Sequence, residues 1–576
     1  MKHTKKVAAL LLSAACAFSA LTACGGMGNG GGKVKAEATE IVVKCRRAGF
    51  GTDWLYELKG KFEAAYAQQG YKVKILTPDN SIKDETVIKE LALGYDSVGV
   101  DLYITSGATP DKVGALGDYG VLVEDLGEIV YNQPAIAYDG TEEEKLVSEK
   151  VSPDTLDYMT DSYGVQYAYC WAQTSGGLVI NTRKLANYNL EIPKTTNEMF
   201  DCFDKIYCGT NGIKGSIYSG TYPITYIPGG NGYALVFLYT MLAQYDGEFF
   251  DKFWSFQTKD ETGAVTNLSD EECLALYEDE TLEKMMETAY RAFDMKISAP
   301  GSLSQTVDQA QAKVMGDIDG AVFMFNGDWM LNEVKLNYRN RLNDIDFVNF
   351  PVISSLGTKL FGAGTAYNFD DAKCEELLSY IVGLVDENKE IEEMIELVKT
   401  NKGVELAEED VKEVARARGV TYSRGVEHVA YITKNSAKKD IAALFLRMMA
   451  SNDYGETFSR TANGTSPYYA QENTISEYKF VRNASKLPAN KYFSLVSLST
   501  GARGYRKQLN LGQMFTTQSH VPDYISANSK TSIYEVDCTH NGSPISVYTD
   551  AAKVFLKAEV ENVTKNWQKY KDMAGL

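Results

Sequence analysis

The chain has 576 residues, with 77 acidic and 58 basic side chains and a formal net charge of −19 at pH 7. This length allows two or more domains, each with its own hydrophobic core. So acidic a surface repels phosphate backbones, which argues against a nucleic-acid partner and says nothing positive about the ligand. The four histidines have no H-x-x-x-H spacing and no C-x-x-C pair is present, so we expect no metal site and no cofactor.

The first 23 residues have the pattern of a signal peptide. Lys2, Lys5 and Lys6 precede an apolar run that is too short for a membrane span. The segment Leu21-Thr-Ala-Cys24 resembles the bacterial lipobox, in which the cysteine receives diacylglycerol and palmitate and becomes the new N-terminus. The alternative is a plain signal peptide in which Cys24 is incidental. Residues 25–33 are Gly-rich, so we expect residues 24–40 to form a lipidated flexible tether.

Alternating strands and helices are predicted directly after this tether. Residues 41–45, 72–76 and 100–104 have the β-branched composition of strands, and residues 53–68 and 83–93 have helical spacing. This order implies a mostly parallel sheet covered by helices. Ligands settle outside the carboxyl ends of such strands, so we expect the loops at 49–54 and 105–108 to lie at a binding site.

The rest of the body gives further elements. Strands are expected at 177–181, 317–325 and 345–352, and apolar helices at 440–449 and 551–570. The Gly-rich stretch 221–233 is expected to be a loop. The charged region 377–418 is helical with a break near Lys402-Gly403, and we interpret it as an insertion with a solvated face.

The cysteines do not indicate a disulfide framework. Cys16 leaves with the signal and Cys24 is the lipidation site, so seven cysteines remain, an odd number. A chain of this length does not need disulfide staples. Cys202 and Cys208 are close enough in sequence to pair, but buried free thiols are the preferred interpretation.

Four segments, in order, resemble the extracellular solute-binding proteins of carbohydrate ABC importers, which are distantly similar to maltose-binding protein. They are Asp101–Leu126, Gly176–Glu198, Ala321–Trp329 and Ile432–Phe445. Each segment alone is a weak match, and the four in family order are specific. Asn197 stands where the family usually has Trp.

The resemblance implies an α/β, two-lobed periplasmic-binding-protein-like fold with discontinuous lobes, a hinge and an interlobe cleft. We expect one lobe at 41–168 plus 361–485, including the insertion, and the other at 169–360 plus 486–576. It further implies a monomeric, non-enzymatic protein that is lipid-anchored on the extracytoplasmic face of a bacterial cell membrane. Such a protein captures a carbohydrate, closes around it and delivers it to the permease subunits of an ABC importer.

Aromatic rings beside polar side chains suit a sugar, because rings cover the apolar C–H faces while carboxylates, amides and guanidinium groups bond to the hydroxyls. Trp329 with Asp328 offers this pairing after a strand; the alternative is a core Trp with Asp328 as a helix N-cap. Asp53 is equally suited to an N-cap, and Trp171 and Trp254 to packing. The candidate ligand contacts are Asp53, Ser106, Tyr169, Trp171, Asn231, Tyr233, Trp254, Asn326, Asp328, Trp329, Arg503 and Tyr505.

Other functions remain open from the sequence. The ligand would be a peptide if the site held the charged termini of a chain. It would be a polyamine if acidic side chains lined the site. A surface glycoside-degrading enzyme would need a carboxylate pair, and acids are plentiful, but no particular pair and no nucleophile motif stands out. A purely structural surface protein is the third alternative.

Overall fold

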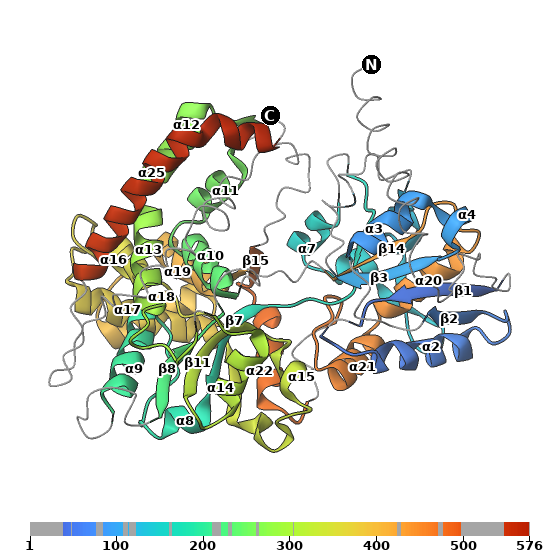
Figure 1. Ribbon diagram of the computed structural model, residues 1–576, viewed down its shortest axis with the longest axis horizontal. Coiled ribbons are helices and arrows are strands. Elements are labelled where there is room, and N and C mark those ends of the chain that lie inside the picture. Colours follow the sequence, from blue (N-terminus) through green and yellow to red (C-terminus); the bar gives the residue numbers. More distant parts are fainter. Residues whose placement is uncertain are drawn as a thin grey trace, which may run out of the picture.

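The computed structural model describes residues 39–47, 49–76, 84–106, 113, 122–160, 164–209, 220–227, 233–260, 264–302, 304–422, 428–469, 476–496 and 546–574. These residues form two α/β lobes, each with a sheet covered by helices, which lie side by side in Figure 1. The predicted fold class is therefore confirmed. No helix of the described residues is long and apolar enough to cross a membrane.

The first lobe is built on the five-stranded sheet β2-β1-β3-β14-β6. Strands β1 (Glu40–Cys45), β2 (Lys72–Leu76) and β3 (Leu102–Ser106) are parallel, whereas β14 (His428–Ile432) runs antiparallel between β3 and β6 (Tyr169–Cys170). Helices α3 (Asp84–Leu93), α20 (Lys439–Met449) and α21 (Asn452–Ala462) belong to the same lobe. Helix α2 (Asp53–Ala65) follows β1 and buries Trp54, Leu55, Leu58 and Phe62, the helical stripe that the spacing predicts.

The second lobe is built on the four-stranded sheet β12-β7-β11-β8. Strand β7 (Gly176–Asn181) runs antiparallel to β12 (Ile345–Val348) and to β11 (Gly320–Gly327), and β11 is parallel to β8 (Thr221–Thr225). Alternate residues of β7 enter different cores: Leu178 and Ile180 face one, and Val179 faces the other. Both faces of this sheet are therefore covered, which agrees with its continuous apolar strands.

Helices on the larger face of this sheet form most of the second lobe. They include α9 (Thr196–Cys208), α10 (Tyr233–Tyr245), α11 (Gly247–Ser255), α13 (Glu280–Ala292), α16 (Ser355–Phe361) and the closing helix α25 (Ser546–Ala574). In Figure 1 the red helix α25 lies along α13. The smaller face carries α14 (Val307–Met315), α15 (Met330–Val334) and α22 (Lys479–Ala489).

The region interpreted as an insertion belongs to the second lobe. Helices α17 (Asp371–Asp386), α18 (Ile391–Lys402) and α19 (Glu408–Gly419) bury Leu377, Ile381, Val398 and Val414 in the core that also holds β7. Assigning residues 361–422 to the first lobe was therefore wrong, and the same holds for α22. The solvated charges of these helices hid an apolar stripe on each. The predicted break is a left-handed helix end at Gly403, with φ +67°.

The Gly-rich stretch was only partly predicted. Residues 221–225 form β8, not a loop. This strand contains Pro223, which cannot donate to a ladder, and β8 lies at the edge of its sheet, where a proline is tolerated. The structure therefore overturns the loop prediction for this part.

The segment that carries the chain from the first lobe to the second lies beside residues 464–466. Gln173 forms an isolated antiparallel bridge with Thr465, and its backbone N–H donates to the Thr465 carbonyl at 2.9 Å. The chain passes from the first lobe to the second through residues 171–175. Residues 464–466 lie just after α21.

Cysteine chemistry in the described residues is mostly that of buried thiols. Cys45, Cys170, Cys202, Cys273 and Cys374 are free and buried. Cys208 is disulfide-bonded, so it does not pair with Cys202. The preference for free thiols is confirmed for Cys202 and is wrong for Cys208. Burial raises the pKa of the Cys202 thiol to about 12, which keeps it protonated and unreactive.

Candidate ligand-binding site

Trp329 lies where the two lobes meet. It follows β11 and is the residue before α15, both in the second lobe, yet its partly exposed ring packs against the core of the first lobe. Gly327 makes this ring position possible, because a Cβ at that residue would lie 2.0 Å from Trp329 Cζ3. Gly49 approaches from the first lobe, and a Cβ there would lie 3.9 Å from the Trp329 Cβ. The indole is therefore a surface shared by both lobes.

Asp328, next to this indole, carries a buried carboxyl group. Its side chain is 6% exposed, and its Oδ1 has no hydrogen-bond partner. Burial raises the pKa of Asp328 to about 8, so the group is largely protonated at neutral pH and can donate a hydrogen bond. Its backbone N–H donates to the Ser175 carbonyl at 3.1 Å, which ties it to a segment that joins the lobes. Trp329, not Asp328, occupies the N-cap position of α15.

A polar contact between the lobes flanks Trp329. Asn332 of α15 is buried, and its Oδ1 accepts from Asn463 Nδ2 at 3.0 Å. Asn332 also donates to the carbonyl of Ala462 at the end of α21. These bonds fix α15 against the first lobe and thereby fix the position of the indole that precedes it.

The carboxyl edge of the first-lobe sheet brings three polar residues together. Ser106 ends β3 and is half-buried; its carbonyl accepts from Arg46 Nη1 at 2.6 Å. His428 pairs with Ser106 in register at the start of β14. Ser106 is a predicted ligand contact, which stays a prediction, whereas Arg46 and His428 were not among the predicted contacts. Arg46 had a usable signal, since it directly follows the first predicted strand.

Two aromatic candidates lie inside the first lobe and not on its surface. Trp171 is 1% exposed, its Nε1 donates to the Thr105 carbonyl at 2.8 Å, and its ring stacks on Trp54 with centroids 5.1 Å apart. Tyr169 is fully buried and stacks on Tyr468 at 4.8 Å. A ligand cannot reach either ring in this structure. Their predicted role in ligand contact is corrected to a role in core packing.

Asn326 is likewise corrected. It is 1% exposed within β11, and its Oδ1 accepts the backbone N–H of Gly327 at 2.7 Å. The side chain therefore shapes the strand end beneath the Trp329 ring. Asp53 is exposed in the first turn of α2, where the helix dipole favours a carboxylate, and no contact places it at the junction.

The remaining candidates are not tested by the structure. Tyr233 begins α10 and Trp254 lies in α11, but their side chains lie outside the described part. Asn231, Arg503, Tyr505 and the lipidation candidate Cys24 also lie outside the described residues. Among the described residues, no group of three or more His, Cys, Asp or Glu could hold a metal ion.

The junction thus combines a partly exposed indole with a buried, largely protonated carboxyl group. An indole face covers an apolar ring face, while a buried carboxylic acid can both donate and accept hydrogen bonds. Within the described residues, the partly exposed Trp329 indole therefore offers a face that suits a ring-shaped ligand.

Comparisons with known proteins identify the fold. No family model and no curated protein matches the sequence. A solved chitin oligosaccharide binding protein matches the structure with a TM-score of 0.50 and 13% identity, over 91% of this chain and 100% of that one. The apo-form of RafE from Streptococcus pneumoniae matches with a TM-score of 0.51 and 12% identity, over 91% and 98% of the two chains.

Proposed function

We propose, on the premise of this shared two-lobed fold, that the protein captures a carbohydrate between its lobes and delivers it to an ABC importer. The observation that carries the proposal is the partly exposed Trp329 ring at the lobe junction, next to the buried Asp328 carboxyl group. The similarity to a chitin oligosaccharide binding protein supports an oligosaccharide as the ligand class. In this proposal Trp329 stacks on a sugar ring, and the buried Asp328 carboxyl group beside it supports the turn that carries the indole.

The proposed location follows from the N-terminal sequence. The signal-like residues 1–23, Cys24 and the Gly-rich tether support secretion and attachment of a diacylglycerol group at Cys24. Such an anchor holds the monomeric protein at the extracytoplasmic face of the cell membrane, beside the permease subunits. Metabolic labelling with radioactive palmitate tests this: label on the wild-type protein and none on Cys24→Ala supports the anchor, whereas equal labelling refutes it.

Calorimetry with the secreted chain tests the ligand class. Chitin oligosaccharides, raffinose and maltooligosaccharides form the sugar panel, and trialanine and spermidine represent peptides and polyamines. We expect at least one sugar to bind and to compact the protein in small-angle scattering, as lobe closure requires. Binding by only the peptide or the polyamine would overturn the carbohydrate proposal. Release of shorter sugars during incubation would show an enzyme instead.

A matched pair of tryptophan variants tests the site. Trp329→Ala is expected to weaken sugar binding about tenfold, since the sugar ring loses a stacking partner worth on the order of 1.5 kcal/mol. Trp567→Ala on α25 is the control, because that half-buried ring contacts Phe256 in the second lobe at 6.1 Å between centroids, far along the chain from the junction. Equal affinities of Trp329→Ala and wild type would remove the junction as the site.

A further inference from the structure

A cavity lies within the second lobe and has no lining residue from the first lobe or from α15. Its volume is about 490 Å³, and it is bordered by α9, α13, α16 and α17. Helix α13 contributes one polar face, because residues three or four apart on a helix share a side. This face consists of Glu280, Lys284, Glu287, Thr288 and Arg291.

Arg291 is the unusual member of this face. Its side chain is 5% exposed, and its guanidinium group stacks on the Phe200 ring with the Cζ 4.3 Å from the centroid. Its ion pair is long, with Nη2 lying 3.6 Å from Asp204 Oδ2, and its Nε has no hydrogen-bond partner. A buried cation with an unsatisfied donor is costly, and an acceptor that bears a negative charge would lower this cost.

An unsatisfied acceptor lies one helical turn away. Glu287 Oε2 is buried without a hydrogen-bond partner, and the nearest cation, Lys284 Nζ, is 3.6 Å from it. Ser355 Oγ, also on the cavity wall, has no hydrogen-bond partner either. Arg291 and Glu287 are four residues apart on α13, yet they do not pair with each other. The cavity therefore offers one cationic and one anionic group, each with an atom that lacks a hydrogen-bond partner.

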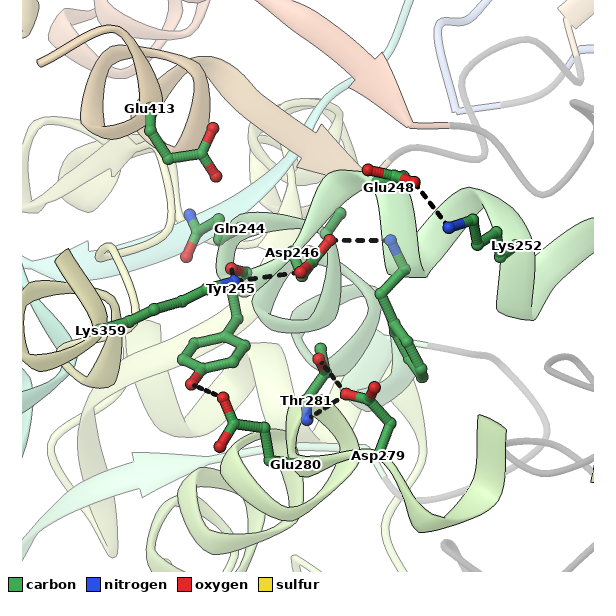
Figure 2. Close-up of polar contacts among 12 residues, drawn as sticks. Gln244, Tyr245, Asp246, Glu248, Lys252, Asp279, Glu280, Thr281, Lys359 and Glu413 are labelled. Atoms are coloured by element: carbon green, nitrogen blue, oxygen red, sulfur yellow. Dashed lines mark hydrogen bonds and ion pairs between the residues drawn. The ribbon is translucent and has the colours of Figure 1, made fainter. Parts of the chain in front are cut away.

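Three further charged groups of the wall, Glu280, Lys359 and Glu375, are already engaged, whereas Lys284 and Asp371 also line the cavity. Figure 2 shows the Tyr245 hydroxyl donating to Glu280 at 3.0 Å and Lys359 paired with Asp246 at 3.0 Å. On the opposite side, Glu375 accepts from Asn197 Nδ2 at 3.1 Å. Glu280, Lys359 and Glu375 therefore already have protein partners, and we do not assign them a contact with a ligand.

We propose that this cavity binds a small zwitterion of the α-amino acid type, with its carboxylate on Arg291 and its ammonium group on Glu287. A guanidinium fork matches a carboxylate in shape and charge. A neutral sugar would satisfy the hydrogen bonds but would leave the guanidinium charge with only its long ion pair to Asp204, and a simple anion or cation would interact with only one of the two groups. The volume lies within the usual range of small-molecule sites. This site is independent of the proposed carbohydrate site.

Methyl NMR of the secreted chain with ¹³C-labelled methionine methyl groups tests the proposal. Met285 and Met286 of α13 report on the cavity, and Met448 of α20 in the first lobe is the internal control. The probes are L-glutamine, L-leucine and L-phenylalanine, with acetate, methylammonium and glucose for comparison. We expect at least one amino acid to shift the Met285 and Met286 signals saturably while Met448 stays unchanged, and we expect no such shift from the other three probes.

Variants make the test specific to the two charged groups. Glu287→Gln and Arg291→Lys are each expected to weaken amino-acid binding at least tenfold, whereas Lys252→Ala on α11, outside the cavity, leaves it unchanged. Glu287→Gln keeps size and shape, so it remains informative if Arg291→Lys does not fold. The proposal is overturned if no amino acid shifts the signals, if glucose or acetate shifts them as strongly, or if Glu287→Gln binds like wild type.

Discussion

Replacement of Asp328 by Asn should change how the stability of the protein depends on pH. Burial raises the pKa of Asp328 from 3.8 to about 8 in the folded chain. The folded state therefore holds a proton that the unfolded chain releases near pH 4, which makes folding most favourable at low pH. As the pH rises from 3.8 to about 8, the wild-type protein loses the stabilisation that comes from this bound proton. The amide of the Asp328→Asn variant has no proton to lose, so the variant lacks this contribution to the pH dependence.

The size of the effect follows from the two pKa values. A pKa difference of one corresponds to about 1.36 kcal/mol. Between pH 5 and pH 8, the free energy of unfolding of the variant should therefore rise relative to that of the wild type by on the order of 4 kcal/mol. This is an upper value, because solvent rearrangement around a partly relaxed carboxylate reduces it. Above pH 8 the difference should level off. The amide oxygen of the new side chain can still accept the backbone hydrogen bonds of the site, so we expect the same fold.

Urea unfolding at four pH values between 5 and 9 measures this difference, with circular dichroism as the probe. Asp550→Asn, which removes an exposed carboxyl of α25 in the same lobe, is the matched control and should not show this gain. A constant difference for Asp328→Asn as well would refute the reasoning. It would mean that the Asp328 carboxyl group is ionised in the folded protein and has a charge partner.

Three further outcomes test other parts of the structure. Trp171→Ala should lower the free energy of unfolding by about 3–5 kcal/mol, as for other buried aromatic rings, and leave the sugar affinity of the folded protein within twofold; a selective loss of affinity would return Trp171 to the site. Gly327→Ala should weaken sugar binding in calorimetry as Trp329→Ala does, because the new Cβ displaces the indole; unchanged binding would contradict this. Arg418→Ala should cost about 2–3 kcal/mol in urea unfolding, since it removes a buried guanidinium that pairs with the exposed Asp386 at 2.7 Å and donates to the Phe350 carbonyl at 2.9 Å, whereas the exposed Lys412→Ala should leave stability nearly unchanged. An equally small effect for Arg418 would argue against the close packing of α19 on the second lobe.

Periodicity made the first lobe largely predictable. The strand at 72–76 matches β2, and the helix predicted from 53 begins at Asp53 because four apolar side chains recur on one face. These patterns are local, so they need no knowledge of distant partners. The left-handed end at Gly403 was visible for the same reason.

Long-range packing limited the rest. The depth of Trp171 depends on Trp54 and His428, which lie more than a hundred residues away on either side, and no local pattern reveals that they enclose it. The helices after residue 370 were assigned to the wrong lobe because their lobe is chosen by contacts with the core around β7, almost two hundred residues earlier. Trp329, which follows β11, is partly exposed at the lobe junction, and its contact with a ligand stays a prediction. Asn326 lies within β11 and is buried, because the strand extends two residues further than the sequence pattern predicts.

The position of Trp329 also bears on how binding would be coupled to closure. A ligand shifts the balance between open and closed lobes only if it binds the two states differently. The indole belongs to the second lobe but packs on the first, and the adjoining Asp328 is hydrogen-bonded to Ser175 in the segment that joins the lobes. A sugar ring on this indole, as proposed, would touch both lobes only when they are together. The contact would then be strongest in the closed state, so a receptor with Trp329→Ala should lose ligand-induced compaction together with affinity. Retained compaction at saturating sugar would place the coupling elsewhere.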